Sequence, residues 1–141
     1  MNLFKKIFFR EVGIEVPPKD IKTTGHEGTF QLLIKDLVIG ELSQDHAGWT
    51  FEYTQAFKDQ ERYRRIVGFS DLERVYRNDT LWPFFRMRIP GLKQPLVQEI
   101  LRQEDIDRLD EFTLLKRFGR RSASNPYLLE LTDAKGELVV N

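Results

Sequence analysis

The stretch Leu81–Gly91, LWPFFRMRIPG, combines a tryptophan, two phenylalanines, two prolines and two arginines. Trp and Phe bury more apolar area than other side chains, and Arg is the cation preferred where a contact excludes water. Such a segment is either a hub of the hydrophobic core or an anchor for a partner protein. Because large aromatic side chains usually lie inside a fold, the core is the first interpretation.

An anchor role within this stretch is predicted for Trp82. Pro83 has a fixed φ angle, so the turn is stiff, and an aromatic side chain on a stiff turn loses little entropy when it enters a pocket. Arg86 and Arg88 can pair with acids of a partner. We therefore predict a partner-binding surface of Trp82, Pro83, Arg86 and Arg88, with Phe85 in the core. The alternative is that Trp82 is fully buried.

The overall composition bears on the class of partner. Lys plus Arg and Asp plus Glu both number 22, and the sequence pI is about 6.8. This balance gives no reason to expect nucleic acid or a membrane as partner of the whole molecule. The chain has no cysteine, which excludes disulfides and suits a reducing cytosol. It has no apolar run of about 20 residues, so we expect a soluble, cytoplasmic protein.

The first 28 residues differ from the rest. As a helix, Met1–Arg10 sets Leu3, Phe4, Ile7 and Phe8 on one face, as in a helix that docks on a protein or lies on a membrane. Docking on its own domain or a partner is favoured, because one short basic helix binds lipid weakly. Residues 12–28 are rich in glycine and proline and predict an extended arm. We place the folded domain at 29–141.

The domain begins with a predicted antiparallel sheet. Apolar and polar residues alternate over Thr29–Ile34, Leu37–Leu42 and Trp49–Tyr53, which predicts three strands. Gly40 lies inside the second strand, where it indicates a bulge or a close approach of another group. Later in the chain, 127–131 and 138–140 flank a turn and predict a terminal hairpin.

Two helices are predicted in the second half. Pro95 suits the first turn of a helix over 95–103, and Gly119 ends a helix over 109–118. We expect both helices to cover one face of the sheet, giving an α+β fold with a bent antiparallel sheet, or partial barrel. The acids between Glu104 and Glu111 lack the spacing of a calcium site and indicate helix caps.

The middle of the chain is rich in arginine. Residues 56–65 predict a short helix or a loop, while 67–69 and 73–76 predict short extended pieces. Interleaved with Tyr63, Tyr76 and Trp82, the arginines suggest single-stranded nucleic acid as one alternative. Pairing with the chain's own acids, or solvation, is favoured in a balanced sequence. These arginines are Arg62, Arg64, Arg65, Arg74, Arg77, Arg86 and Arg88.

No catalytic constellation is present in the sequence. His26 lies in a glycine-rich arm and His46 in a polar turn, and no serine has the surroundings of a nucleophile. No glycine-rich loop with a lysine indicates nucleotide binding. We expect no enzyme activity, metal, cofactor or small-molecule substrate.

Four motifs in this order resemble the N-terminal subdomain of HipA-type serine/threonine kinases, over about Phe30 to Leu131. They are the VG-x-L strand at Val38, Gly40 and Leu42, the F-x-Y strand in WTFEY at Trp49–Tyr53, the FF-to-Pro-Gly segment at Leu81–Gly91, and the helix EFTLLKRFGR at Glu111–Arg120.

The resemblance implies a function through a protein partner. In the family, the ATP site and catalytic Asp lie downstream of this subdomain, and the present chain ends where they would begin. Some toxin–antitoxin systems encode the subdomain as a separate small protein that binds and restrains a kinase lacking it. The resemblance thus implies a stand-alone regulatory subunit of a HipA-like kinase core. The alternative is a peripheral membrane or nucleic-acid adaptor that uses the basic N-terminus and the arginine-rich middle.

Overall fold

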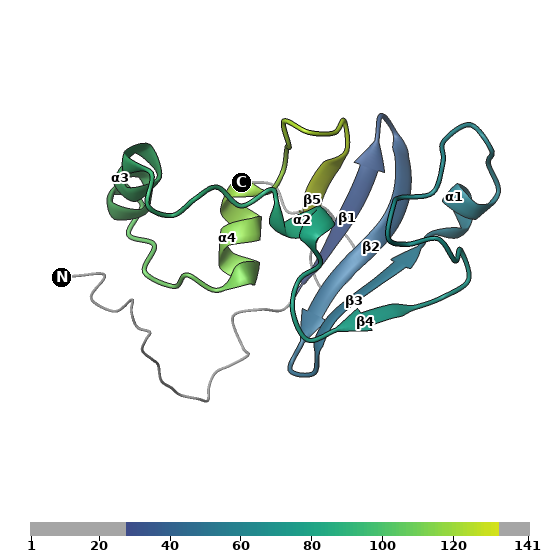
Figure 1. Ribbon diagram of the computed structural model, residues 1–141, viewed down its shortest axis with the longest axis horizontal. Helices are drawn as coiled ribbons and strands as arrows, with labels where there is room; N and C mark the ends of the chain where they lie inside the picture. The colour runs from purple at the N-terminus through teal and green to yellow at the C-terminus, as the bar shows by residue number, and fades with distance from the viewer. Residues whose placement is uncertain (1–27, 133–141) are drawn as a thin grey trace.

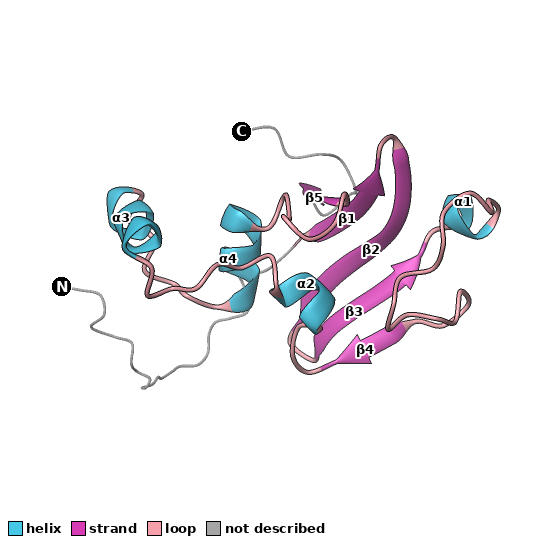
Figure 2. Cartoon of the chain, turned by 45° about the horizontal axis from the view of Figure 1, so that its top comes forward, coloured by secondary structure: helices cyan, strands magenta, loops and turns pink. Residues whose placement is uncertain are grey.

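The computed structural model describes residues 28–132. In this part the chain forms five strands and four helices, and the strands pair antiparallel in the order β4-β3-β2-β1-β5 (Figure 1). The sheet is open and twisted (Figure 2), which confirms the predicted α+β class. The predicted N-terminal helix, most of the arm and the second strand of the terminal hairpin lie outside the described residues.

The three predicted strands are confirmed. They are β1 (Thr29–Ile34), β2 (Leu37–Asp45) and β3 (Gly48–Tyr53). Two further strands border them: β5 (Leu128–Thr132) pairs with β1, and β4 (Tyr76–Asn78) pairs with β3. The prediction of an extended piece over 67–69 is wrong, because the chain makes a turn there, and the piece predicted over 73–76 overlaps β4 only at Tyr76.

Gly40 has both features that its place in a strand predicts. Leu32 pairs with Gly40 but Leu33 pairs with Val38, so Ile39 is an extra residue and the strand bulges there. A Cβ at position 40 would lie 2.6 Å from the ring of Phe51. Glycine therefore lets that ring pack flat against the second strand.

The core lies on one face of the sheet. Phe30, Leu42 and Phe51 are opposite one another on β1, β2 and β3, and each is at most 1% exposed. The helical turn α2 (Pro83–Arg86) and helix α4 (Glu111–Phe118) cover this face (Figure 2). Helix α1 (Gln55–Lys58) follows β3 and buries Phe57 at the edge of the same core.

Helix α3 (Pro95–Gln103) has the predicted bounds, but the prediction that it covers the sheet is wrong. Its buried residues Val97 and Leu101 pack with Leu114 of α4 in a separate cluster, and Figure 2 shows α3 beyond α4, away from the strands. An apolar stripe shows that a helix has a buried face without naming the surface it meets. The sheet face next to α4 is occupied instead by α2.

The boundaries of α1 and α4 follow from capping. Thr54 accepts a hydrogen bond from the backbone N–H of Phe57, and Asp110 accepts one from Thr113 at 2.8 Å. The predicted helix over 109–118 thus starts at Glu111, and an acid follows its cap as the predicted dipole partner. The helix ends on Phe118, before Gly119 as predicted.

Candidate partner-binding surface

The organising stretch Leu81–Gly91 contains a helical turn. Trp82 has an extended backbone and Pro83 is the first residue of α2. The backbone N–H groups of Phe85 and Arg86 both donate to the carbonyl of Trp82, at 3.0 and 2.9 Å. Proline at a helix start already has the required φ angle, so the turn is stiff. Trp82 and Arg86 are four residues apart and therefore lie on one side of it.

Phe85 is the core residue of this turn, as predicted. It is 0% exposed, and its ring centroid lies 5.0 Å from that of Phe84, 5.5 Å from Phe51 and 6.1 Å from Phe69. Tilted aromatic contacts at these separations contribute beyond area burial. Phe85 thus joins α2 to β3 and to the loop before β4.

Trp82 is partly buried, so it is neither fully buried in the core nor fully exposed. One edge of its ring meets Phe69 in a T-shaped contact, with centroids 5.3 Å apart. Within the part of the chain that the structure describes, its indole N–H donates no hydrogen bond. This arrangement leaves a donor and part of an aromatic face for a partner.

Arg86 is held beside Trp82 by the first turn of α4. Its side chain is 47% exposed, its Nε lies 3.4 Å from Oε2 of Glu111, and Nη2 donates to the carbonyl of Leu81. Pro83 is exposed between the two. The structure therefore brings Trp82, Pro83 and Arg86 together, and we call these three residues the α2 surface.

Arg88 lies apart from the α2 surface. It is 4% exposed, and its guanidinium donates to the carbonyls of Gly119, Arg120 and Tyr127 and to Oδ1 of Asn125, at 2.9–3.2 Å. Burial lowers the pKa of Arg88 to about 10, so it remains a cation at neutral pH. In this structure Arg88 joins the segment after α2 to the segment between α4 and β5.

Glu111 has a role that the sequence analysis missed. Its Oε1 accepts hydrogen bonds from the indole N–H of Trp49 at 3.0 Å and from the backbone N–H of Leu81 at 3.2 Å. Its Oε2 faces Arg86. One carboxylate thereby links β3, α4 and the start of the α2 segment. Its place in the first turn of a helix indicated a dipole partner and gave no sign of these contacts.

Most of the middle arginines contact the chain itself. Arg62 lies over the ring of Tyr63 and Arg74 over that of Tyr76, each about 5.4 Å or less from the centroid. Arg77 donates to Thr50. Arg86 pairs with an acid, Glu111, as expected, whereas these three arginines contact aromatic rings or a hydroxyl instead. Such contacts use cationic surface that a nucleic-acid adaptor would present.

Residues 28–132 contain neither a cluster of metal ligands nor a helix that could cross a membrane. No three His, Cys, Asp or Glu side chains of this part lie where they could jointly hold a metal ion. None of its helices has the length and apolar character needed to cross a bilayer. His46 is exposed in the turn between β2 and β3.

The family model of the HipA N-terminal domain matches residues 30–123. This chain belongs to the HipA N-terminal domain family. The match contains all four motifs of the resemblance, including the α2 surface. A solved structure described as the "N-terminal domain of HipA toxin" is similar over 75% of this chain and 93% of its own length, with 17% identity and a TM-score of 0.49. A comparison with curated proteins found no match.

Proposed function

We propose that this HipA N-terminal domain protein is a non-catalytic regulatory module that binds a separate HipA-like serine/threonine kinase core. Its setting would be a toxin–antitoxin system. Membership of the HipA N-terminal domain family supports a HipA-related module of this kind. The matched region, residues 30–123, includes all three residues of the α2 surface.

The observation that carries the proposal is the geometry of the α2 surface. A partly buried tryptophan, whose indole N–H has no partner among residues 28–132, stands on a proline-stiffened turn, beside an exposed proline and a half-exposed arginine. Trp and Arg are the residue types most enriched at binding hot spots, and a stiff support reduces the entropy lost on binding. Glu111 holds the arginine in place from α4, so the surface is formed before any partner arrives.

The proposal is tested with any HipA-like kinase core that a neighbouring gene encodes. We expect Trp82→Ala to weaken binding to that core by about 2 to 4 kcal/mol, as hot-spot aromatics do. Isothermal titration with purified full chain and kinase core measures this loss. Binding by the Trp82→Ala protein equal to that of the wild type would contradict the α2 surface as the site.

Two control variants separate binding from folding. Phe85→Ala removes a fully buried ring from the same turn, so it should weaken binding only because the domain unfolds, which circular dichroism detects. Arg77→Gln removes an exposed arginine of β4 that lies outside the α2 surface, so it should bind as the wild type does. A variant that loses binding while its circular dichroism spectrum is unchanged identifies a contact residue.

A further inference from the structure

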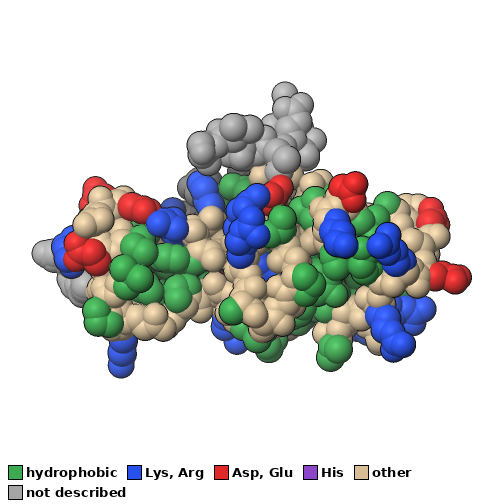
Figure 3. All heavy atoms as spheres, turned by 90° about the horizontal axis from the view of Figure 1, so that it is seen from above, with side chains coloured by type: hydrophobic (Ala, Val, Ile, Leu, Met, Phe, Trp, Pro, Cys, Tyr) green, Lys and Arg blue, Asp and Glu red, His purple; other side chains and the backbone are tan. Residues whose placement is uncertain are grey.

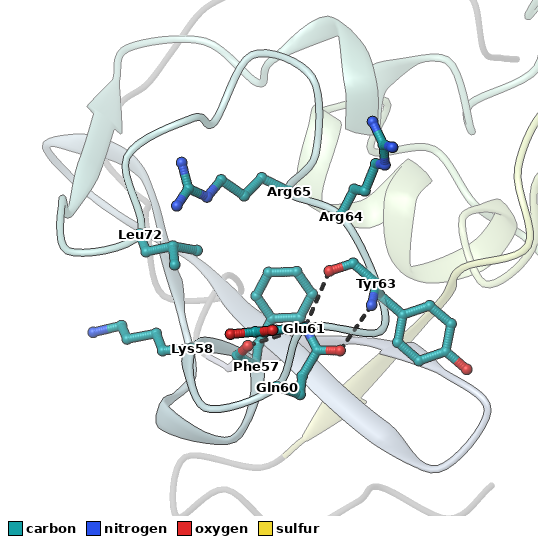
Figure 4. Close-up of a pocket in the computed structure, with 8 residues that line it drawn as sticks. All are labelled: Phe57, Lys58, Gln60, Glu61, Tyr63, Arg64, Arg65 and Leu72. Atoms are coloured by element: carbon teal, nitrogen blue, oxygen red, sulfur yellow. Dashed lines mark hydrogen bonds between the residues drawn. The ribbon is translucent and has the colours of Figure 1, made fainter.

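A hollow of about 440 Å³ lies between α1 and the loop that leads to β4. Phe57, Tyr63 and Leu72 provide its apolar lining, and Figure 4 shows the Phe57 ring in the middle of the group. A volume of this size is within the range of pockets that take a small ligand or a side chain. None of the residues of the α2 surface lines it.

The wall of this pocket is fixed by one side chain. The amide nitrogen of Gln60 donates to the carbonyls of Phe57 and Tyr63, both at 3.1 Å, and its amide oxygen accepts from the backbone N–H of Tyr63 at 2.8 Å. Three hydrogen bonds from one amide hold the chain after α1 in a single path, as the dashed lines in Figure 4 show. The pocket is therefore formed without a ligand.

The rim of the pocket has an excess of positive charge. Lys58, Arg64 and Arg65 line it together with a single acid, Glu61. Lys58 is paired with Glu73 at 3.1 Å, which lies outside the lining, so its charge is offset. Figure 3 shows basic side chains beside apolar surface at the end of the molecule that carries α1.

The two arginines are the groups available to an anion. Arg65 donates from Nη1 to the carbonyl of Ser70, which leaves its other N–H groups for a ligand. Arg64 makes no hydrogen bond or ion pair with the described residues. Both side chains are exposed. Guanidinium groups bind carboxylates through paired hydrogen bonds, so this rim is complementary to an acidic ligand.

The turn that follows the two arginines carries an exposed apolar side chain, which does not line the pocket itself. Ile66–Phe69 is a tight turn closed by the bond from Phe69 N–H to the Ile66 carbonyl at 2.9 Å, with Gly68 at φ +96°. Ile66 and Phe69 are buried, and the hydroxyl of Tyr53 bonds to both of their backbones. Val67 at the tip is 93% exposed. A stiff turn thus holds an aliphatic side chain in water next to the arginines.

We propose that this pocket binds an acidic peptide segment of a partner protein, with an apolar side chain against Leu72, beside the nearly buried ring of Phe57, and flanking carboxylates on Arg64 and Arg65. This proposal does not rest on kinase binding through the α2 surface. A nucleic-acid strand fits less well, because its affinity depends on many phosphate contacts, whereas this rim offers two arginines beside a Lys58 already paired with Glu73, in a chain with equal numbers of acids and bases.

The test uses the full chain and a synthetic peptide, acetyl-Glu-Glu-Leu-Glu-Glu-amide, with the Gln-Gln-Leu-Gln-Gln peptide as its neutral match. In NMR titrations up to about 10 mM, we expect the acidic peptide to shift the backbone amides of residues 57–65 and the neutral peptide to bind about ten-fold more weakly. Raising sodium chloride from about 50 to about 500 mM should weaken the acidic peptide alone.

Two variants locate the contact. Arg64→Gln, which breaks no hydrogen bond to the described chain, and the double variant Arg64→Gln/Arg65→Gln should each lose affinity, the double variant by about ten-fold or more. The control Arg77→Gln makes the same charge change outside the pocket and should bind the peptide as the wild type does. Thermal melts show that each variant is folded.

Several results would overturn the proposal. They are equal binding of the acidic and neutral peptides, equal losses in the double variant and the Arg77→Gln control, and unshifted amides at the highest peptide concentration. Stronger shifts of the same amides by a thymidine oligonucleotide than by the peptide would also overturn it and assign the pocket to nucleic acid. Peptide binding is measured without kinase, so its failure leaves the kinase proposal standing.

Discussion

The two tryptophans of this chain occupy regions with opposite roles. Trp49 on β3 is 1% exposed, stacks 6.3 Å from Phe112, and donates its indole N–H to Glu111. Trp82 before α2 is partly buried, and its indole N–H has no partner in the described chain. Helix α4 covers the first, whereas the second has the core on one side only. The same side chain is thus a core residue where a helix lies across it and a candidate binding residue where no helix of residues 28–132 does.

The largest expected loss of stability is that caused by replacing Trp49. Trp49→Ala should destabilise the domain by about 3 to 5 kcal/mol, because it empties the space between β3 and α4 and leaves Glu111 without its indole donor. Urea unfolding followed by circular dichroism measures the loss. A loss below about 1 kcal/mol would show that α4 does not depend on this contact and would end the distinction between the two tryptophans.

A smaller effect on stability is expected at Arg88. Arg88 is buried and Arg86 is half-exposed, so the two arginines differ in burial as the two tryptophans do. Arg88→Met should cost about 2 to 4 kcal/mol of stability, since it removes the donors that satisfy three backbone carbonyls near the end of α4. The matched Arg86→Met change, at a half-exposed ion pair, should cost about 1 kcal/mol or less. If urea unfolding gave equal losses of stability for the two variants, the hydrogen bonds of Arg88 would not hold the segment after α2 to the segment between α4 and β5.

For Trp82 itself the expected loss of stability is lower again. Trp82→Ala should cost about 1 to 2 kcal/mol, because part of the ring packs on Phe69 while the rest already contacts solvent. Its thermal melt should therefore fall between those of the wild type and Trp49→Ala. A Trp82→Ala protein that melts as early as Trp49→Ala would assign this ring to the core and remove the basis of the α2 surface.

The sequence predicted the parts of the fold that depend on local pattern. Alternation over β1, β2 and β3 and the stops and caps of α3 and α4 are properties of neighbouring residues, and the elements lie where these signals place them. The prediction that α3 covers the sheet was wrong, because the apolar side chains of α3 pack on α4 and the sheet face is covered by α2. The pairing partner of a stripe depends on contacts between residues far apart in the chain.

In the candidate site, too, only the arrangement of residues close in sequence was predictable. Trp82, Pro83 and Arg86 are close in sequence, and a proline-started turn keeps them together. Arg88 lies only two residues further, but its direction depends on carbonyls after α4, about thirty residues away. Glu111 likewise acts on Trp49 and Leu81 across the fold. Long-range hydrogen bonds of this kind leave no periodic pattern in a sequence.

The smallest expected effect concerns Glu111, which links the two tryptophan regions. Glu111→Gln keeps an oxygen that accepts from Trp49 and Leu81 and removes only the charge that faces Arg86. Because that ion pair is partly exposed and 3.4 Å long, we expect a loss of less than about 1 kcal/mol. Glu111→Ala removes the acceptor as well and should cost about 1 to 3 kcal/mol, since the buried indole and amide donors are left unpaired. If urea unfolding gave the same loss for both variants, the charge of Glu111 rather than its hydrogen bonds would join α4 to the α2 segment, and Trp49 and Arg86 would be coupled through electrostatics alone.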